Sequence, residues 1–516
     1  MLPAPADGRV GNFVSRRGEC PHRAGDGGCG TSTASSARMT KAPPESAKDL
    51  RPDGATRQDL RDLPALQDIL ERYSAPVPRY TSYTAATVWR DDFSTPVARD
   101  ILESAGSTGP LSLYVHLPFC KKLCHYCGCT MMVTRSEELV DAYLGALEQE
   151  ISEQAALACR SPVVQLHLGG GTPTFLTSAQ LRRLFGALSR AYTFAPAAEL
   201  SIEVHPPVTT DEQMATLADL GFNRVSMGVQ DFDPDVQRAV NRIQPFEQTR
   251  HLIEHSRRLG FQSVNVDLMY GLPLQTPESL ARTLDQVELL RPDRIALFGY
   301  AHVPAIKKHQ QRLEQFGLPG PADRLQLFQQ STRRLLEMGY AFIGLDHFAL
   351  PDDELVRARA NGTLHRSFMG YTTCAQADLI GLGASSISDV GGAYLQNTRD
   401  VRDYIRRVAD GGLAITRGWL PSEDDHIRRA VLQDLFCNLR LDCAEFDARE
   451  GVDSRAYLAS EMLRLAPFQD DGLVRMDGAS ITVTPTGQFL LRNIASVFDA
   501  HLAQVRATAP ALSQSV

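Results

Sequence analysis

The sequence predicts an α/β protein built on a parallel sheet that curves into an incomplete barrel. Strand-like and helix-like segments alternate over residues 109–343, and six βα units of this kind form a parallel sheet. A cysteine-rich loop follows the first predicted strand, at the edge where active sites of parallel barrels gather. An N-terminal arm precedes the barrel, and a mainly helical domain follows it.

Composition limits the possible functions. The chain has 516 residues, 43% of them hydrophobic, which suffices for a large core and about two to four domains. Its net charge of -8 offers no basic excess for nucleic-acid binding. The sequence shows neither an apolar run long enough for a membrane span nor a secretory signal. Ten cysteines, four of them clustered, favour a reducing compartment, so a cytoplasmic location is expected.

The first segment, residues 1–59, is rich in Gly, Ala, Ser, Pro and Arg. This composition cannot bury enough surface to order itself, so a disordered extension is expected. Cys20, His22 and Cys29 are only weak evidence for a metal-binding site, because no predicted helix or strand surrounds them. Translation from Met39 is an alternative that would make the first stretch an artefact.

The arm, residues 60–108, combines a helical period in LRDLPALQDILERY with the extended, proline-rich stretch PVPRYTSY. Tyr80 and Tyr83 offer aromatic faces with polar tips, which suits an arm that packs on the barrel. Arg79 suits a substrate carboxylate through bidentate pairing, and it suits a surface salt bridge equally well.

The barrel, residues 109–343, begins with LSLYVHLPFCKKLCHYCGCT. Three residues separate Cys120 from Cys124, two separate Cys124 from Cys127, and Cys129 follows closely. Thiolates are soft ligands for iron–sulfur clusters or zinc, and this loop is long enough to wrap three of them around one face of a cubane cluster. Because such a cluster has four irons, three ligands leave one iron open.

Zinc and disulfide alternatives fit this loop less well. Structural zinc usually needs a second ligand pair about twelve to twenty residues away, whereas the next cysteine, Cys159, stands alone. His125 lies inside the same short loop, where tetrahedral geometry is poor. A disulfide does not suit a chain without secretory features.

Further strands are expected after the first, with polar groups at their ends. The six expected strands are Leu111–His116, Val164–Leu168, Leu200–Val204, Arg224–Met227, Ser263–Leu268 and Arg294–Phe298, with helices between them at, for instance, Ser136–Ala158 and Ser178–Ala191. The loop Gly169–Thr172 lets the backbone approach a ligand, where exposed amides could bond a carboxylate or amine, unless it is only a tight turn. Glu203 ends the third strand and should point into the barrel mouth.

The remaining chain reads as three parts. Residues 344–421 form an irregular connecting segment in which Asp346, His347, Arg366 and Tyr371 are the kind of polar groups that line a substrate cleft. Residues 422–505 combine amphipathic helices with a short hairpin turning at Asp477-Gly478, a pattern resembling a winged helix. Acids about balance bases there, so a lid or docking domain is favoured over DNA binding. Residues 506–516 look like a flexible tail.

The cysteine spacing CxxxCxxC after a strand is the signature of radical S-adenosylmethionine (SAM) enzymes. Longer stretches resemble one family among them, the oxygen-independent coproporphyrinogen III oxidases (dehydrogenases) of anaerobic haem biosynthesis. The resemblance runs from about Leu63 to about Leu502, through PRYTSY, YVHLPFCKKLCHYCGC, HLGGGTPTFL, SMGVQDFDPDVQRAVNR, VDLMYGLP, GLDHFALPDDEL and LHRSFMGYTT, in that order. Many dispersed motifs in order are more specific than a single one.

This resemblance implies an incomplete parallel (β/α)6 radical SAM barrel, open toward a large flat substrate and covered by the arm. It implies a 4Fe–4S cluster on Cys120, Cys124 and Cys127, with one SAM on the open iron and a second SAM beside it. Gln230 would follow the fourth strand, and Arg242 would lie on the next helix. The SAM contacts implied by the family are Tyr114, Tyr126, Gly170, Gly171, Thr172, Glu203, Gln230, Arg242, Asp267, Ala301 and Ile387.

The resemblance also implies a reaction. A reduced cluster would split SAM into methionine and a 5′-deoxyadenosyl radical, which would take a hydrogen from the β-carbon of a propionate. Loss of carbon dioxide and one electron would leave a vinyl group, and two rounds would turn coproporphyrinogen III into protoporphyrinogen IX. Tyr114 is expected close to SAM and the cluster, and Cys129 is expected to matter for activity without ligating iron. A monomer served by an electron donor such as flavodoxin or ferredoxin is expected.

Two alternatives remain open. A paralogue could use the same two-SAM site for methyl transfer or cyclopropanation. Positions at which this chain departs from the family's sequence pattern keep that alternative open: His205, Pro207, Gly299, Leu350 and Cys374. A haem-carrying chaperone is the second alternative, but such relatives tend to lack the RYTSY arm and the cysteine after the cluster motif, and this chain keeps both.

Overall fold

The computed structural model describes residues 69, 72–73, 77–158 and 160–508. The predicted disordered extension, residues 1–59, and most of the predicted helix before Tyr73 lie outside the described residues. None of the described helices combines the length and the apolar character that crossing a bilayer requires.

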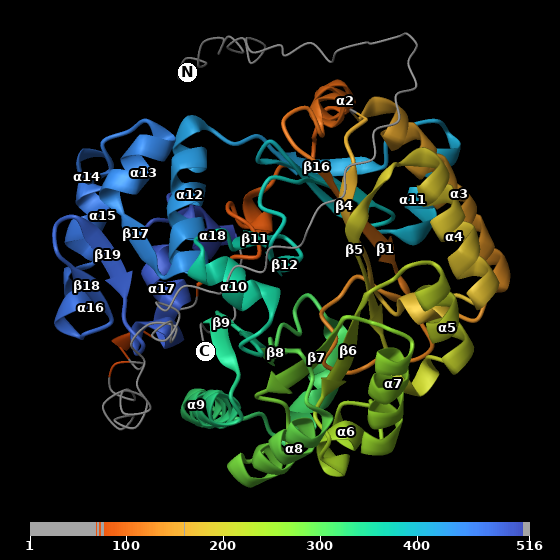
Figure 1. Cartoon of the computed structure of the whole chain (residues 1–516), viewed down its shortest axis with the longest axis horizontal. Helices are drawn as coiled ribbons and strands as arrows, with labels where there is room; N and C mark the ends of the chain where they lie inside the picture. The colour runs from red at the N-terminus through yellow and green to blue at the C-terminus, as the bar shows by residue number, and fades with distance from the viewer. Residues whose placement is uncertain (1–68, 70–71, 74–76, 159, 509–516) are drawn as a thin grey trace, which may run out of the picture. The chain divides into compact units, whose positions relative to one another are not determined.

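A twelve-stranded sheet runs through the described part of the chain, in the order β16-β15-β14-β13-β1-β4-β5-β6-β7-β8-β10-β9 (Figure 1). The strands from β13 to β8 in this order are parallel, and those at both ends are antiparallel. Because the two end strands, β16 and β9, do not pair with each other, the sheet is an incomplete barrel, as predicted. Its strands are β1 (Leu111–Leu117), β4 (Val163–Gly170), β5 (Phe194–Val204), β6 (Arg224–Gln230), β7 (Ser263–Tyr270), β8 (Arg294–Gly299), β9 (Ala341–Gly344), β10 (His347–Ala349), β13 (Asp378–Leu382), β14 (Ile387–Val390), β15 (Ala393–Asn397) and β16 (Ile415–Trp419).

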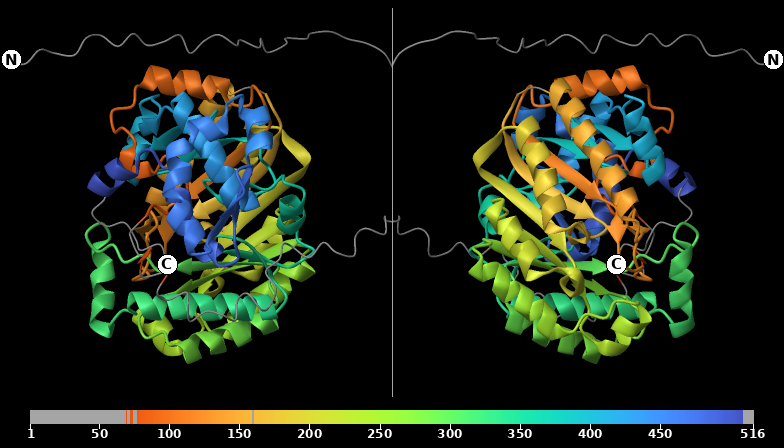
Figure 2. Two further views of the ribbon diagram at one scale, coloured as in Figure 1. Left: turned by 90° about the vertical axis from the view of Figure 1, so that its left-hand side faces the viewer. Right: turned by 90° about the vertical axis from the view of Figure 1, so that its right-hand side faces the viewer.

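Helices connect the parallel strands and cover the outer face of the sheet (Figure 1). They are α3 (Glu137–Leu157), α4 (Ser178–Ala191), α5 (Asp211–Asp219), α6 (Pro234–Ala239), α7 (Phe246–Arg258), α8 (Pro277–Leu290) and α9 (Pro321–Glu337). Thr177, Thr210 and Thr276 begin α4, α5 and α8 by accepting a backbone N–H through their hydroxyls, as capping boxes do. In the right-hand view of Figure 2, α3 and α4 lie side by side in front of the strands, and they are in contact.

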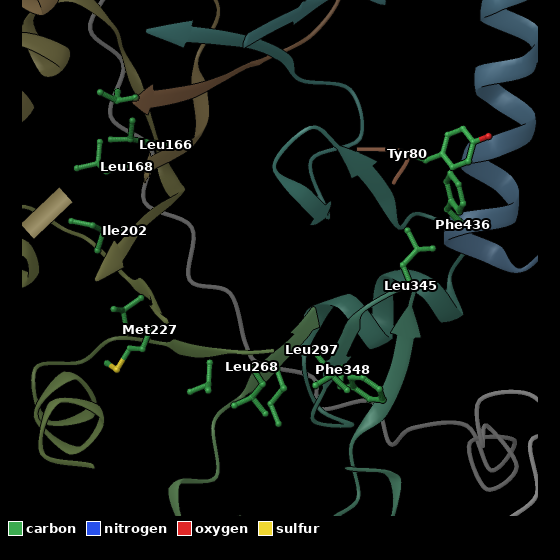
Figure 3. Packing of buried hydrophobic residues seen from close by; sticks show 14 of the residues in the cluster. Tyr80, Leu166, Leu168, Ile202, Met227, Leu268, Leu297, Leu345, Phe348 and Phe436 are labelled. Atoms are coloured by element: carbon green, nitrogen blue, oxygen red, sulfur yellow. The ribbon is translucent and has the colours of Figure 1, made fainter. Parts of the chain in front are cut away.

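The core lies between the outer face of the sheet and these helices. Alternate strand residues are buried there, for example Leu113 at 0%, Leu166 at 0% and Ile202 at 0% exposure, and they pack with helix residues in one cluster. Figure 3 shows such side chains following successive strands, with Tyr80 and Phe436 beyond them. This arrangement is what the apolar, β-branched strand sequences predict.

The inner face of the sheet is polar, because the intervening residues point into the barrel. A chain of hydrogen bonds and ion pairs crosses its floor. Ser112 Oγ donates to Gln165 Oε1 (2.9 Å), Gln165 Nε2 donates to Glu199 Oε1 (2.9 Å), and Arg224 Nε contacts Glu199 Oε2 (2.7 Å). Arg224 also donates to Glu354 Oε1 (2.6 Å), on the helix that follows β10. These bonds tie four strands and the connecting segment together.

Residues 344–421 were expected to be irregular, and this expectation is wrong. The segment contains α10 (Glu354–Ala360), the hairpin β11 (His365–Ser367) and β12 (Gly370–Thr372), then β13 to β15 and α11 (Val401–Ala409). Its strands have only three to five residues, too short to produce a clear alternation of polar and apolar side chains. The segment therefore extends the main sheet rather than merely connecting two domains.

The C-terminal part is helical with a small sheet, as predicted (Figure 1). Its elements are α12 (Glu423–Asn438), β17 (Arg440–Asp442), α13 (Cys443–Glu450), α14 (Ser454–Tyr457), α15 (Ala459–Arg464), α16 (Ala466–Asp470), β18 (Val474–Met476), β19 (Ser480–Val483), α17 (Leu491–Ser496) and α18 (Leu502–Thr508). The predicted hairpin is present, with Gly478 at φ +78° in its turn. The amphipathic stretch after residue 453 forms three short helices, α14 to α16.

The arm packs against the end of the chain. Its described elements are the 3₁₀ turn η2 (Ala86–Val88) and the helix α2 (Thr95–Ser104). Tyr80 and Tyr83 are buried, at 4% and 6% exposure. The Tyr80 hydroxyl donates to Asp499 Oδ2 (3.0 Å), and the backbone N–H of Ala500 donates to the Tyr83 hydroxyl (3.4 Å). The Tyr80 ring lies 5.9 Å from that of Phe436 (Figure 3).

Candidate active site

The three cysteines of the CxxxCxxC motif follow β1 and lie together on the rim of one cleft. Cys120 ends the short strand β2 (Phe119–Cys120), which pairs with β3 (Met132–Val133), so the ends of the loop are held together. Near the middle of the loop, the backbone N–H of His125 donates to the Val240 carbonyl (2.9 Å). The loop is thereby fixed on the carboxyl-terminal side of the barrel.

Residues from the segment after β8 hold the same loop by its carbonyl oxygens. Lys307 Nζ donates to Cys129 O (2.8 Å), His309 Nε2 donates to Cys127 O (2.8 Å), and Gln310 Nε2 donates to Tyr126 O (2.9 Å). His309 and Gln310 belong to the 3₁₀ helix η5 (Lys308–Phe316). These three residues are not evident as site residues from the sequence. They belong to a polar run after the last predicted strand, which is the one feature of the sequence that marks them.

Polar groups surround the thiols. Cys120 Sγ lies 3.5 Å from Thr172 Oγ1, and Arg242 Nη1 donates to Cys124 Sγ (3.7 Å). A hydrogen bond from the Cys129 thiol lowers the pKa of Cys127 to about 6. Burial raises the pKa of Cys120 to about 11, so that thiol needs a metal to be deprotonated at neutral pH.

These residues fit an iron–sulfur cluster. Three soft sulfur ligands share one rim, and a cubane spreads its ligands over a wider span than one ion does. In the described residues, no three His, Cys, Asp or Glu side chains lie close enough together to hold a single metal ion. Arg242 places a positive charge beside thiolates that would carry negative charge.

The cleft has a volume of about 580 Å³ and lies at the carboxyl ends of the barrel strands. Of the predicted site residues, the following line it: Cys120, Cys124, Tyr126, Cys127, Cys129, Gly170, Gly171, Thr172, Glu203, Gln230, Arg242, Asp267 and Ala301. Residues from the cysteine loop and from five strands thus converge on one space.

Two predicted residues do not line the cleft. Tyr114 lies behind it on β1, where its hydroxyl is 3.0 Å from His116 Nδ1 and its ring stacks on His167 at 5.9 Å. Ile387 begins β14, and its side chain is 7% exposed in a separate apolar cluster with Val88 and Trp89 of the arm. Tyr114 lies within β1, before the end of the strand at which the cleft begins. A sequence motif alone does not show this depth.

The glycine loop is tightly built. Gly170 has φ +112°, and a Cβ there would lie 2.7 Å from the His116 ring. The amides expected to face a ligand are used within the protein: Gly170 N–H donates to Glu203 Oε2 (3.1 Å), Gly171 N–H to Leu117 O (2.8 Å) and Thr172 N–H to Phe119 O (2.9 Å). The expectation of exposed amides is therefore wrong, because all three amides donate hydrogen bonds within the protein.

Glu203 ends in the cleft, as predicted, with 43% of its side chain exposed. Its Oε1 lies 3.3 Å from His167 Nε2, whose ring is oriented by Ser201 Oγ at 2.7 Å from Nδ1. Burial opposes ionisation, but the bonds from His167 and Gly170 outweigh it and lower the pKa of Glu203. The cleft thus holds an ionised carboxylate at neutral pH.

Gln230 and Arg242 line the cleft, and each has a buried polar atom without a hydrogen-bond partner among the described residues. Gln230 ends β6 with φ +69°, and its Oε1 is buried without a hydrogen-bond partner among the described residues. Arg242 Nη2 donates to Gly228 O (2.5 Å), whereas its Nε is buried without such a partner. Arg242 was expected on a helix, but it lies in the loop between α6 and α7. Buried polar atoms of this kind are usually satisfied by a ligand or water.

Asp267 lies on the inner face of β7, in register with Gly228 of β6. Asn265 Nδ2 donates to its Oδ1 (2.7 Å), but burial and the nearby Glu203 charge raise the pKa of Asp267 to about 7. Two carboxyl groups in one cleft therefore differ in charge near neutral pH.

The structure shows the surroundings of His205 and Gly299, two positions at which this chain differs from the family's sequence pattern. Burial, followed by the positive Arg242 and Lys122, lowers the pKa of His205 to about 3, so a neutral ring lines the cleft there. Gly299 is confined, since a Cβ would lie 2.8 Å from the Tyr270 hydroxyl, and its carbonyl accepts from Arg79 Nη2 (2.6 Å). Arg79 thus closes one side of the cleft from the arm.

Two family models match the chain. Residues 114–287 match the model described as the Radical SAM superfamily, and residues 422–490 match the HemN C-terminal domain. The first match covers the cysteine loop and most of the barrel, and the second covers most of the C-terminal helical part.

Named relatives cover most of the chain. The chain is 46% identical over 436 residues to the oxygen-independent coproporphyrinogen III oxidase of Escherichia coli K12, covering 84% of this chain and 95% of that protein. It is 44% identical over 439 residues to the protein of that name from Pseudomonas aeruginosa, again covering 84% and 95%. The solved structure titled as the radical SAM enzyme coproporphyrinogen III oxidase (HemN) from E. coli matches with a TM-score of 0.80, 46% identity, and coverage of 82% of this chain and 98% of that chain.

Proposed function

Because the chain belongs to the family of oxygen-independent coproporphyrinogen III oxidases, which are radical SAM enzymes, we propose that its cleft decarboxylates coproporphyrinogen III. Two propionate side chains become vinyl groups, and the product is protoporphyrinogen IX. The observation that carries this function is the meeting of the three cysteines with Glu203 and Arg242 in one cleft.

The cofactors are a 4Fe–4S cluster and SAM, which together supply a 5′-deoxyadenosyl radical when the cluster is reduced. Cys120, Cys124 and Cys127 would hold the cluster, and the clamp formed by Lys307, His309 and Gln310 would keep its loop in place. The protein's contribution is to bind, orient and shield these groups.

The cleft residues divide the recognition of SAM among them. The ionised Glu203 suits ribose hydroxyls as a hydrogen-bond acceptor, and Thr172 lies beside Cys120 where the amino acid part of SAM would sit. Gln230 and Arg242 offer the unused polar atoms for further contacts. Gly170 and Gly171 contribute shape, because side chains at these positions would not fit.

We also propose that the cleft binds a second SAM molecule. Tyr126, Asp267 and Ala301 line the part of the cleft that would hold it. Ile387 would contact that molecule only after a rearrangement, because its side chain packs with the arm. Tyr114 acts through neighbouring groups: its ring supports His167, which in turn holds Glu203. Cys129, exposed beside Cys127, is proposed to act on the substrate side without ligating iron.

Partners follow from the same chemistry. The reaction needs an electron donor such as flavodoxin or ferredoxin, and one chain supplies every group of the cleft described above, which suits a monomer. The described cysteines are free thiols, and cluster ligands require reducing surroundings, which supports a cytoplasmic location.

The test is anaerobic incubation of the reconstituted protein with SAM, a reductant and coproporphyrinogen III, followed by mass spectrometry. Loss of two carboxyl groups with formation of 5′-deoxyadenosine is expected. Deoxyadenosine without decarboxylation would instead indicate a radical enzyme with another substrate, and bound porphyrin with neither product would indicate a carrier protein. In parallel, Ser in place of Cys120, Cys124 or Cys127 should abolish the broad absorbance near about 400 nm expected of such clusters.

A further inference from the structure

Arg366 lies outside the cofactor cleft, in a position that is unusual for a charged side chain. It sits in the middle of β11, is 9% exposed, and its guanidinium lies 5.0 Å above the Tyr371 ring. Gln433 of α12 binds both its backbone N–H (3.2 Å) and its carbonyl (2.6 Å), so the main chain is fixed on two sides. The guanidinium is therefore held in place by an aromatic ring and by a fixed main chain, and neither of these carries a negative charge.

No anion accompanies this charge. Nε and Nη1 of Arg366 are buried without a hydrogen-bond partner, and none of the described ion pairs includes this residue. Neighbouring buried arginines differ: Arg429 pairs with Asp389 (2.5 Å), and Arg492 pairs with Asp346. A buried charge is normally paired, because desolvation without a partner costs several kcal/mol.

The surroundings leave room for a carboxylate group and hold no free acid among the described residues that line them. Arg366 lines a pocket of about 30 Å³ together with the arm residues Tyr80 to Tyr83, Arg429 and Asp389, and Asp389 is already paired with Arg429. His347, a neighbouring ionisable group, is edge-on to Tyr371 at 5.3 Å and has a buried Nδ1 without a partner among the described residues. Burial and the Arg366 charge lower the pKa of His347 to about 3, so it is neutral at physiological pH. The pocket therefore has a net positive character.

This pocket is separate from the cofactor cleft, with which it shares no lining residue. It is nevertheless close to it through aromatic contacts: the His347 ring lies 5.9 Å from that of Phe298, and Phe298 lines the cleft. The two sites are therefore only a few side chains apart. A carboxylate that must react has to sit beside the cofactors, whereas a carboxylate in this pocket would only be held.

We propose that Arg366 and the arm form a subsite for a propionate that the reaction leaves intact, with the guanidinium binding the carboxylate. The proposal rests on the proposed function, since it assigns part of the same substrate. A guanidinium is well suited to this role because it binds carboxylates bidentately and cannot lose its charge at neutral pH. The arm then contributes directly to substrate binding, because its residues form one wall of the pocket that holds the carboxylate.

The experiment compares Arg366→Met, Arg366→Lys and a matched surface change, Arg182→Met, whose native side chain is 50% exposed. Anaerobic titration with coproporphyrinogen III should show affinity about 10- to 100-fold weaker for Arg366→Met, less so for Arg366→Lys, and unchanged for Arg182→Met. The uncharged tetra-amide of the same ligand should bind wild type and Arg366→Met equally. SAM affinity should not change in any variant.

A second measurement separates ligand binding from a purely structural role. Without substrate, Arg366→Met should unfold at the same or a higher urea concentration than wild type, because an unpaired buried charge is removed. Arg429→Met should unfold at a lower concentration, because Asp389 loses its partner. Equal binding of coproporphyrinogen III by wild type and Arg366→Met would overturn the subsite alone. If wild type bound SAM but not coproporphyrinogen III, the proposed function would fail and the subsite with it.

Discussion

Replacing Asp267 by Asn should make the protein's stability less dependent on pH. Burial and the nearby Glu203 charge raise the pKa of Asp267 to about 7, although Asn265 and Ser226 donate hydrogen bonds to it. A carboxyl group with a higher pKa in the folded state resists deprotonation there. Its ionisation therefore weakens folding as the pH rises from the unfolded pKa toward the folded one.

The magnitude follows from the two pKa values. Each pKa unit corresponds to about 1.4 kcal/mol, so the change from 3.8 to about 7 corresponds to an upper limit of about 4 kcal/mol once the group is fully ionised. Between pH 6 and pH 8 the unfolded side chain stays ionised while the folded one loses its proton. That interval alone should lower the free energy of unfolding by about 1.4 kcal/mol in wild type.

The assay is urea unfolding of protein without SAM or cluster, at pH 6 and pH 8. Asp267→Asn keeps an oxygen for the Asn265 amide, so its gain over wild type should be about 1.4 kcal/mol larger at pH 8 than at pH 6. Asp219→Asn, at a side chain 66% exposed, provides the control and should show no such difference. An equal effect of Asp267→Asn at both pH values would refute the reasoning.

Three further changes test other parts of the molecule. Glu150→Leu should destabilise by about 3–5 kcal/mol in urea unfolding, because the buried tyrosine, asparagine and backbone donors around it lose their acceptor; Glu150→Gln should cost less. Tyr80→Phe should cost about 1–3 kcal/mol by leaving Asp499 Oδ2 without its donor, and should speed tryptic cleavage of the arm. Arg224→Met should cost about 3–5 kcal/mol in urea unfolding, because Glu199 loses its ion-pair partner whereas Glu354 keeps Arg294; an unchanged unfolding midpoint would contradict this.

The barrel and the grouping of the three cysteines on one cleft could be predicted because their signals are local. All six predicted strands are present, and their boundaries differ from the observed ones by only a few residues, except that Phe194 begins β5 earlier. Cys120, Cys124 and Cys127 lie within eight residues, so their proximity required no knowledge of the fold.

What the sequence could not show depends on long-range pairing. The strands of the segment 344–421 are too short to be recognised alone, and they form only because the edge at β1 accepts β13. Lys307 and His309 reach the cysteine loop from about 180 residues away. The unpaired state of Arg366 is equally invisible in sequence, because it depends on the fold pairing Asp389 of the same pocket with Arg429 instead.

The attachment of the arm to the end of the chain has a consequence for biosynthesis. Tyr80 is bonded to Asp499, 419 residues later, and Asn493 Nδ2 donates to the Tyr73 carbonyl (2.7 Å). On the ribosome, the barrel and its cysteine loop emerge well before the residues that fasten the arm. The pocket wall that the arm provides is consequently completed last, so we expect the arm to stay unattached until translation is nearly finished.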